Sequence, residues 1–581
     1  MTLPRYRTRS TNVLVIGAGG GGLRSAVAAH QGGVEVLVLS NRARHDAHTA
    51  LAAGGINAVL GSVDPDDTWQ QHAHDTLVEG HHLGDPRAVE ILAREAPEAV
   101  EELAEWGCPF DRTPEGRIDQ RFFGAHTFRR TCYIGDLTGR AVLRTIADQV
   151  DALGIEVAHG HGVSHLLVHD QRCFGALTFS LDDGTPTVVV ADAVILATGG
   201  HTRLWRNSSS RRDENTGEGI ALALRAGARV ANLELVQFHP TGLTHPEGWA
   251  GTLVTEAVRG TGGRLFNHDG ERFMERYDPE RLELAPRDEV AAACAREISE
   301  GRGTEHGGVL LDVTHLDREV VNSKIPGMRR QLIEAQLLDI LDAPIEVAPT
   351  AHYTMGGIVV DHEDLRTDVD GLFAVGECTT GVHGANRLGG NSLAEVVVFG
   401  RRAGEAAAAY SRSSGGGERD TDTIGAAIDE LDHWARPGDE LALPVLHGLR
   451  EAMSDGCGVQ RDEQGLAATA DRLTSLRNRI ERLDGEGTSM GWTPLARSIA
   501  LRGGALVAEA TVRGARERRE SRGAHRRADH PSTSDERVAL DVTLHGSGEL
   551  SVARRPMPPS PDFGPGLDGG GTLIDAQRLL E

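Results

Sequence analysis

The stretch NVLVIGAGGGGLRSA, residues Asn12–Ala26, decides the fold of this chain. It begins with an apolar run, Val13–Ile16, which predicts a buried parallel strand. The pattern G-x-G-x-x-G follows, carried by Gly17, Gly19 and Gly22. Between a strand and a helix, the first glycine allows a tight turn, the second lets the backbone approach a pyrophosphate, and the third lets the helix pack closely on the strand. The free N–H groups at the start of the helix then face the pyrophosphate. The stretch therefore predicts a dinucleotide-binding α/β fold.

The end of the next strand distinguishes between two dinucleotides. The segment Val34–Leu39 is apolar and predicts the second strand of the unit, and Ser40-Asn41 follows it. In NAD-binding units an acidic residue near this place hydrogen-bonds the ribose 2′-OH. Because Ser40 takes its place here, the sequence favours FAD over NAD.

Length and charge bound the class of protein. A chain of 581 residues is too long for one compact core, so two to four domains are expected. Its formal net charge of −25 argues against a nucleic-acid partner, since phosphate binding needs a basic surface. No apolar run approaches the roughly 20 residues that span a bilayer, and the first residues lack the apolar centre of a signal peptide. We expect a cytoplasmic chain, held at most on the inner face of the cell membrane by a partner.

The cysteines point away from metal chemistry. Six cysteines are scattered along the chain without any C-x-x-C pair. Neither an iron–sulfur cluster nor a structural zinc site has its usual ligand spacing. We therefore expect no metal site in this chain.

Two further glycine turns indicate that the nucleotide-binding domain is discontinuous. Asp192–Gly200 (DAVILATGG) and Asp370–Glu377 (DGLFAVGE) both predict a strand that ends in a turn suited to the same cofactor. The expected architecture is a Rossmann-like α/β FAD-binding domain in two parts, 1–236 and 353–410, with an inserted α+β capping domain at 237–352, a helical C-terminal domain at 423–527 and a partly mobile extension at 528–581.

Two polar stretches have simple interpretations. Ser411–Asp422 is rich in serine and glycine and predicts a linker. Arg513–Arg527 is strongly basic, and we interpret it as a solvated face.

The motifs together resemble one family. The chain is similar to the flavoprotein subunit of succinate dehydrogenase and fumarate reductase, within a superfamily that includes L-aspartate oxidase. The likeness extends from about Asn12 to His525, and the last fifty or so residues have no evident counterpart. The motifs that carry it after the first glycine stretch are ATGG (197–200), QFHPTG (237–242), TEAVRG (255–260), LAPRDEV (284–290), AHYTMGG (351–357) and HGANRLGGNSL (383–393).

The resemblance implies where FAD binds. The expected contacts are Gly17, Gly19, Gly22, Ser40, Thr49, Gly55, Thr198, Gly199, Glu377, Asn391, Ser392 and Leu393. It also implies that His48, in Asp46-Ala47-His48-Thr49, attaches the flavin covalently, although the Arg-Ser that precedes His-Thr in respiratory members is absent.

The resemblance also implies a dicarboxylate site and a proton path. Arginine matches a carboxylate bidentately, and each carboxylate of a dicarboxylate needs its own clamp. The expected substrate contacts are His239, Thr255, His352, Arg387, Gly54 and Phe123. Arg287 is expected to transfer the proton, with Glu256 and Arg259 as the relay to solvent on one helix face.

Three functions remain open from the sequence. The first is interconversion of succinate and fumarate, with electrons passed to an iron–sulfur protein and from there to a quinone-reactive membrane anchor. L-Aspartate oxidase is the second; His48 and the Gly389-Gly390 pair speak against it, because such oxidases usually carry Ala-Ser there. The third is a non-catalytic flavin-binding protein.

Overall fold

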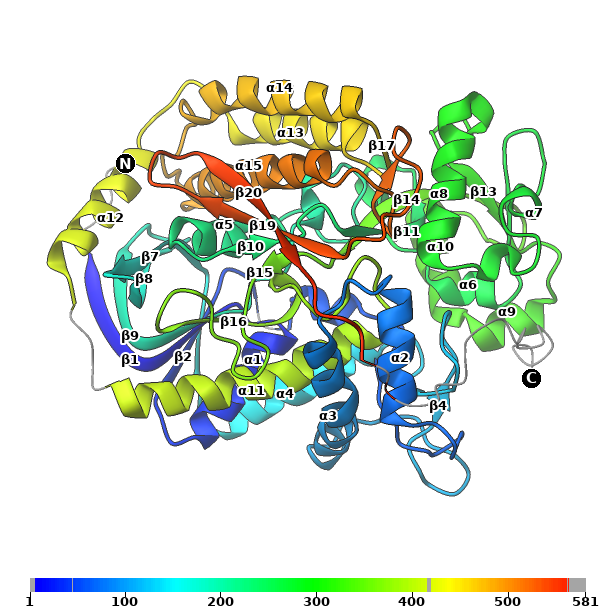
Figure 1. The fold of residues 1–581 in the computed structure, drawn as a ribbon, viewed down its shortest axis with the longest axis horizontal. Helices are drawn as coiled ribbons and strands as arrows, with labels where there is room; N and C mark the ends of the chain where they lie inside the picture. The colour runs from blue at the N-terminus through cyan, green and yellow to red at the C-terminus, as the bar shows by residue number, and fades with distance from the viewer. Residues whose placement is uncertain (1–5, 44, 415–418, 562, 564–581) are drawn as a thin grey trace.

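The computed structural model describes residues 6–43, 45–414, 419–561 and 563, and it is built around a seven-stranded sheet (Figure 1). The strand order is β6-β2-β1-β9-β8-β7, and β16 also pairs with β9. Strands β6, β2, β1, β9 and β16 run parallel to their neighbours, whereas β7 and β8 extend the sheet antiparallel. The strands are β1 (Arg7–Ile16), β2 (Val36–Ser40), β6 (Glu156–His159), β7 (His161–His169), β8 (Arg172–Ser180), β9 (Pro186–Leu196) and β16 (Leu372–Ala374).

The predicted strand–turn–helix unit is confirmed. Helix α1 (Gly20–Gln31) connects β1 to β2 directly after the glycine turn. Gly17 has a φ of +114°, and a Cβ at this position would lie 2.2 Å from the Ala197 carbonyl oxygen. A Cβ on Gly22 would lie 1.9 Å from the carbonyl oxygen of Gly17. Only glycine therefore allows the helix to start this close to the sheet.

Helices cover the sheet with residues from both parts of the chain. Helix α11 packs along α1, and α4 and α3 lie beside them (Figure 1). A discontinuous FAD-binding domain requires this return of the chain to the first sheet. The helices concerned are α2 (Trp69–Glu79), α3 (Pro86–Glu105), α4 (Thr138–Ala152), α5 (Glu218–Arg225) and α11 (Asn391–Ser414).

The segment between the two parts forms its own antiparallel sheet, in the order β11-β14-β13-β12. It also has its own hydrophobic cluster, whose members extend from Leu243 to Val347. We propose on this ground that 237–352 is a separate capping domain. Its elements include β11 (Val236–Leu243), α6 (Glu256–Gly260), β12 (Arg264–Phe266), α8 (Arg287–Glu297), β13 (Val309–Asp312), α9 (Arg318–Lys324), α10 (Pro326–Gln336) and β14 (Ile345–Thr354).

The C-terminal part is helical, and its boundary differs from the prediction. Helix α11 continues to Ser414, so the expected linker from Ser411 is wrong for its first residues, and 415–418 lie outside the described residues. The alanine-rich helix face is buried through Ser411, which explains the extra turn. The helices that follow are α12 (Thr421–Trp434), α13 (Ala442–Gly456), α14 (Glu463–Ile480) and α15 (Thr493–Glu517).

The basic run 513–527 is a solvated face only in part. Arg518 is 2% exposed, and its Nε donates to Oε1 of Glu234 over 2.7 Å, while Arg527 is equally buried. Arg518 also donates to the Asn232 side chain, 3.0 Å away. Breaking one buried pair of this kind typically costs about 3–5 kcal/mol. Part of the run is therefore an internal connection between the C-terminal segment and the FAD-binding part.

The C-terminal segment pairs with a strand from the middle of the chain, which the sequence did not suggest. Strands β19 (Val538–Leu544) and β20 (Leu550–Pro556) form a hairpin, and β19 pairs with β10 (Val230–Ala231). With β15 (Gly357–Ile358) they make a four-stranded sheet, seen across the centre of Figure 1. The first part of the extension, which was expected to be partly mobile, thus forms a hairpin up to Pro556. Residues 562 and 564–581 lie outside the described residues. Among the described helices, none is long and apolar enough to cross a membrane.

Candidate active site

One cavity of about 280 Å³ connects the glycine turn to the cluster of histidines and arginines predicted to bind substrate. Its wall begins at the N-terminus of α1 and continues past the flavin-site motifs to the capping segment. The predicted residues that line it are Gly17, Gly19, Ser40, His48, Thr49, Gly54, Gly55, Phe123, Thr198, Gly199, His239, Thr255, Glu256, Arg287, His352, Glu377, Arg387, Ser392 and Leu393.

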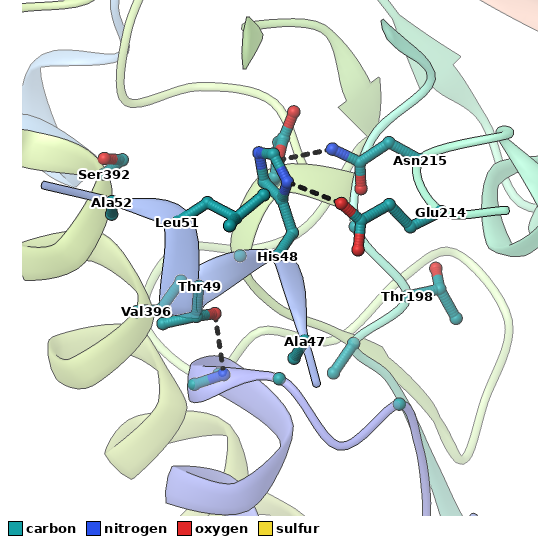
Figure 2. Close-up of a pocket in the computed structure, with 18 of the residues that line it drawn as sticks. Ala47, His48, Thr49, Leu51, Ala52, Thr198, Glu214, Asn215, Ser392 and Val396 are labelled. Carbon is teal, nitrogen blue, oxygen red and sulfur yellow. Dashed lines mark hydrogen bonds and ion pairs between the residues drawn. The ribbon is translucent and has the colours of Figure 1, made fainter. Parts of the chain in front are cut away.

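The glycine end of the cavity fits a pyrophosphate. The N–H of Gly20, the first residue of α1, donates to Thr49 Oγ1 over 3.0 Å, as Figure 2 shows. A Cβ built on Gly19 would meet nothing closer than that same Oγ1, at 3.6 Å. The helix N-terminus and an open glycine backbone thus face the cavity together, which is the donor set that binds a dinucleotide phosphate.

His48 forms an ion pair that the sequence did not predict. Its Nδ1 lies 3.0 Å from Glu214 Oε1, and the backbone N–H of Arg211 donates to the same oxygen over 2.7 Å (Figure 2). Burial opposes protonation of His48, but the hydrogen bond and charge of Glu214 outweigh it, so the pKa of His48 lies above its ordinary value. Burial would raise the pKa of Glu214, but the hydrogen bond and charge of His48 outweigh this effect and lower the pKa of Glu214 to about 2. The pair orients the imidazole within the cavity.

This pair predicts a pH-dependent stability of the flavin-free protein. Because the pKa of His48 is raised on folding, His48 stabilises the fold fully below pH 6.5, and this effect is lost as the pH rises through the folded pKa. Because the pKa of Glu214 is lowered on folding, Glu214 stabilises the fold above pH 4.5, and this effect is lost as the pH falls through about 2. Glu214→Gln should therefore lower the melting temperature most between pH 4.5 and 6.5 and progressively less above it. Thermal melts of both proteins across this range test the window, and a difference independent of pH would contradict it.

Asn391 does not line the cavity, contrary to the prediction that it contacts the flavin ring. Its Oδ1 accepts from Asn57 over 2.7 Å and lies 2.8 Å from His72 Nε2, and its Nδ2 donates to Thr76 Oγ1 over 2.9 Å. Asn391 is fully buried in this network, which holds its side chain away from the cavity. Gly22 is also absent from the wall, because it is the packing point of α1 on the turn.

At the other end, two histidines are held neutral. Burial and the positive charges of the surrounding arginines lower the pKa of His239 and of His352 well below the ordinary value. The backbone N–H of Thr241 donates to His239 Nδ1 over 3.3 Å, which assigns the proton to Nε2. His352 Nδ1 lies 2.9 Å from Ser209 Oγ. The two rings are 5.5 Å apart and face the same space, where a neutral imidazole N–H can donate to a carboxylate.

Arg387 brings a buried positive charge without a protein counter-ion. It is 3% exposed, and it donates to two neutral groups, Gln237 Oε1 at 3.1 Å and Ser392 Oγ at 3.3 Å. Its guanidinium lies 4.5 Å from the centre of the Tyr353 ring. Burial and the charge of Arg287 lower the pKa of Arg387 to about 10. No carboxylate among the described residues forms an ion pair with Arg387, so an anionic ligand would complete the site.

The three residues predicted to form a proton relay lie together. Nε of Arg287 donates to Glu256 Oε2 over 2.7 Å, and Arg259 Nη2 lies 3.8 Å from the same oxygen. Glu256 and Arg259 share one face of α6, as their spacing indicated, but Arg259 does not line the cavity. Burial would raise the pKa of Glu256, but the positive charges of Arg287 and Arg259 outweigh this effect and lower that pKa to about 2. The chain thus places one carboxylate between two guanidinium groups, with Arg287 on the cavity side.

Phe123 occupies the room that Gly54 leaves. A Cβ on Gly54 would lie 2.6 Å from Phe123 Cζ, and one on Gly389 would lie 2.5 Å from Phe123 Cδ1. The ring therefore packs between two glycines and fills the space beside Gly54. Ala at position 389, the residue expected in aspartate oxidases, would push the ring out of its place.

Several wall residues escaped the sequence analysis. Glu214 lines the cavity but belongs to none of the motifs quoted above, and Tyr353 lies within AHYTMGG without having been predicted as a site residue. Asn215 also lines the cavity, and its contact with Glu377, 3.2 Å from Nδ2 to Oε2, joins segments far apart in the chain. Such contacts become visible only in three dimensions.

Comparison with known proteins agrees with this geometry. The model of the FAD binding domain matches residues 12–393, and that of the fumarate reductase flavoprotein C-terminal region matches residues 447–559. The second match corrects the expectation that the chain beyond 528 has no counterpart.

Two curated relatives and one solved structure illustrate the similarity. A chain of the fumarate reductase (CoM/CoB) of Methanothermobacter marburgensis is 41% identical, with 90% of this chain and 95% of the relative covered. The succinate dehydrogenase flavoprotein subunit of Rickettsia felis is 38% identical, with 90% and 91% covered. Sdh1 of Mycobacterium smegmatis, solved in complex with UQ1, has a TM-score of 0.88 at 38% identity, with 97% and 96% covered. The chain belongs to the family of FAD-dependent flavoprotein subunits of fumarate reductases and succinate dehydrogenases.

Proposed function

We propose that this chain is the FAD-dependent oxidoreductase subunit that interconverts succinate and fumarate. The observation that carries the proposal is Arg387, a buried cation without a protein counter-ion at the far end of the dinucleotide cavity. Neutral His239 and His352 flank the same space, so the wall offers one positive charge and several N–H donors to an anion. The glycine cradle and the donors at the start of α1 fit FAD at the opposite end.

FAD, when bound, supplies the acceptor or donor of a hydride. The residues of the chain do the rest. Arg387, His352, His239 and Thr255 bind the two carboxylates and orient the central carbons of the substrate, which converts the reaction into one between fixed partners. The Phe123 ring covers the site and excludes water.

Arg287 holds the proton that is exchanged with the substrate carbon. Its Nε is engaged by Glu256, which leaves the two terminal nitrogens for the substrate. During fumarate reduction, a terminal N–H gives its proton to carbon, and Glu256 with Arg259 returns a proton from solvent. During succinate oxidation, the proton moves in the opposite direction.

Activity assays test the proposal directly. The purified FAD-loaded chain should oxidise succinate with an artificial electron acceptor and reduce fumarate with a reduced viologen dye. The aspartate oxidase interpretation is not favoured, since the relatives are fumarate reductases and succinate dehydrogenases. Aspartate-dependent formation of hydrogen peroxide, with no turnover of succinate or fumarate, would overturn the proposal.

We further propose that His48 carries the flavin covalently. The ring lies in the cavity wall and is oriented by Glu214 through Nδ1, which leaves Nε2 as the nitrogen that could form the bond. Acid precipitation of the protein should leave flavin fluorescence in the pellet, and His48→Ala should release it completely. His30→Ala, outside the cavity, is the control and should retain the flavin. Full release of flavin from the unaltered protein would contradict covalent attachment.

We infer that electrons leave through an iron–sulfur subunit, and through it a quinone-reactive membrane anchor. All six cysteines are buried in this chain and none is in a disulfide, so they offer no exposed cluster site. The relatives are themselves named as subunits. The proposed location is the cytoplasm, peripheral to the inner face of the cell membrane. Co-purification from native membranes with a protein that contains iron–sulfur clusters would test this association.

A further inference from the structure

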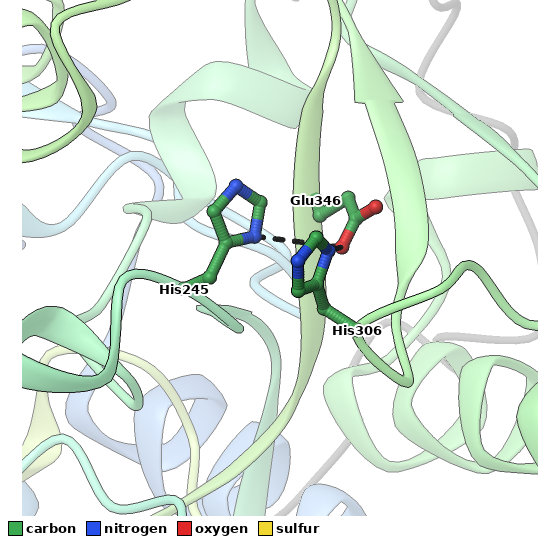
Figure 3. Close-up of side chains that lie close together, drawn as sticks. All are labelled: His245, His306 and Glu346. Atoms are coloured by element: carbon green, nitrogen blue, oxygen red, sulfur yellow. Dashed lines mark hydrogen bonds and ion pairs between the residues drawn. The ribbon is translucent and has the colours of Figure 1, made fainter.

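Three side chains that could bind a metal lie together in the capping segment, outside the cavity already described. They are His245, His306 and Glu346, and their ligand atoms all lie within 4.8 Å of one another (Figure 3). His245 follows β11, His306 lies in the loop before β13, and Glu346 is in β14. The three are separated in sequence by 40 residues or more, so no motif could have revealed them.

The distances match a tetrahedral zinc site. His306 Nδ1 lies 3.0 Å from Glu346 Oε2, and His245 Nδ1 lies 3.5 Å from the same oxygen. Zinc binds histidine nitrogen and carboxylate oxygen at roughly 2.0–2.2 Å, which separates two tetrahedral ligands by about 3.4 Å. Both nitrogen-to-oxygen separations thus lie within about 0.4 Å of this value. The imidazole nitrogens of His245 and His306 lie within 4.8 Å of each other.

Contacts of the fold position the backbone of His245 and of Glu346, and His306 stacks on the His245 ring. The two imidazole rings are stacked, with centres 4.3 Å apart and planes at 29°. Gln336 Nε2, from α10, donates to the backbone carbonyl of His245 over 2.8 Å, and Glu346 pairs with Leu310 of β13. A ligand set held in this way loses little conformational entropy when it binds.

The polar groups converge on a single oxygen. Both imidazole Nδ1 atoms and the Thr244 hydroxyl, which donates over 3.3 Å, approach Glu346 Oε2. A metal ion between them would take the lone pair of each imidazole and the charge of the carboxylate. The side chain of Glu346 is 16% exposed, whereas those of His245 and His306 are 37% and 49% exposed, so the site opens toward solvent.

We propose that His245, His306 and Glu346 bind one Zn²⁺, with water as the fourth ligand. Two imidazole nitrogens and one carboxylate oxygen form a set that suits zinc, whereas Mg²⁺ and Ca²⁺ require oxygen ligands. This differs from the expectation of no metal site, which considered cysteine spacing. The ion would join the loop after β11, the loop before β13 and strand β14. Since β11 and β14 also carry His239 and His352, the metal would fasten the outer ends of the strands that hold the substrate histidines.

Zinc titration of the complete, FAD-loaded chain tests the proposal. After treatment with a chelator, calorimetric titration with ZnCl₂ at about pH 7.5 should show one tight site per chain. His306→Gln and Glu346→Gln should each weaken this binding by about tenfold or more. Zinc should raise the melting temperature of the unaltered chain and leave that of the two variants unchanged. MgCl₂ should not produce either effect.

A matched control separates a built site from general binding to surface histidines. His447 is exposed on α13 and lies 3.2 Å from Glu451, so it offers the same kind of pair without a third ligand. His447→Gln should leave the tight zinc site intact. Co²⁺ in place of zinc should give the intense visible absorption of a four-coordinate ion, and Glu346→Gln should abolish it. The proposal is overturned if the unaltered chain has no tight site, if His447→Gln weakens binding as much as His306→Gln, or if cobalt is six-coordinate.

Discussion

Arg287→Gln is expected to lower kcat by about 10²–10⁴-fold for both succinate oxidation and fumarate reduction, with a much smaller change in KM. The guanidinium is the group that exchanges a proton with the substrate carbon, and glutamine has no proton of comparable acidity. FAD should remain bound, because Arg287 lies at the substrate end of the cavity, away from the glycine turn. Steady-state kinetics and the flavin absorbance spectrum measure both outcomes.

Arg281→Gln is the matched control for this variant. Arg281 lies six residues earlier, is 60% exposed and pairs with Asp278, so its removal should leave kcat unchanged. If Arg287→Gln keeps more than a tenth of the normal kcat while Arg281→Gln behaves as expected, another group supplies the proton. Glu256→Gln would then show whether that proton still passes through the carboxylate.

Arg387→Met is expected to lower kcat/KM for the dicarboxylate by roughly 30- to 5,000-fold, since loss of one partner of a buried charge pair costs about 2–5 kcal/mol. Methionine keeps much of the side-chain volume but removes the positive charge that faces the substrate. A saturated dicarboxylate such as malonate should also lose its effect on the flavin absorbance. Titration of the oxidised protein with malonate measures this binding without turnover.

The control for Arg387→Met must be another buried arginine. Arg502 is 8% exposed and lies in the C-terminal helical part, where it contacts Glu481 and the Trp434 ring. Arg502→Met should lower stability without changing kcat/KM. A similar loss of kcat/KM in both variants would indicate a general effect of removing a buried charge, and it would argue against a carboxylate clamp at Arg387.

Local chemistry explains which parts of the fold could be predicted. The stretch Val13–Gly22 encodes strand, turn and helix start within ten residues, and Gly17 and Gly22 have steric reasons to be glycine. The substrate residues were predictable because the resemblance placed QFHPTG and TEAVRG together. Their side chains do meet in one cavity, although they come from different elements.

Long-range pairing explains what could not be predicted. The partner of Arg518 is Glu234, nearly three hundred residues earlier, so the basic run gave no sign that it is buried. Glu214 reaches His48 from another loop, and the three ligands of the proposed zinc site come from three segments. The periodicity of apolar residues predicts local helices and strands, but it does not predict which distant charged residues pair after folding.

The pairing of β19 with β10 also determines the order of events during synthesis. Strand β10 is made early, but its partner β19 emerges roughly 300 residues later. At about 5–20 residues per second, this edge of β10 waits roughly 15–60 s for its partner on the ribosome. An unpaired strand edge invites contact with other chains. Nascent chains that stop before Val538 should therefore depend on chaperones more than the complete protein does.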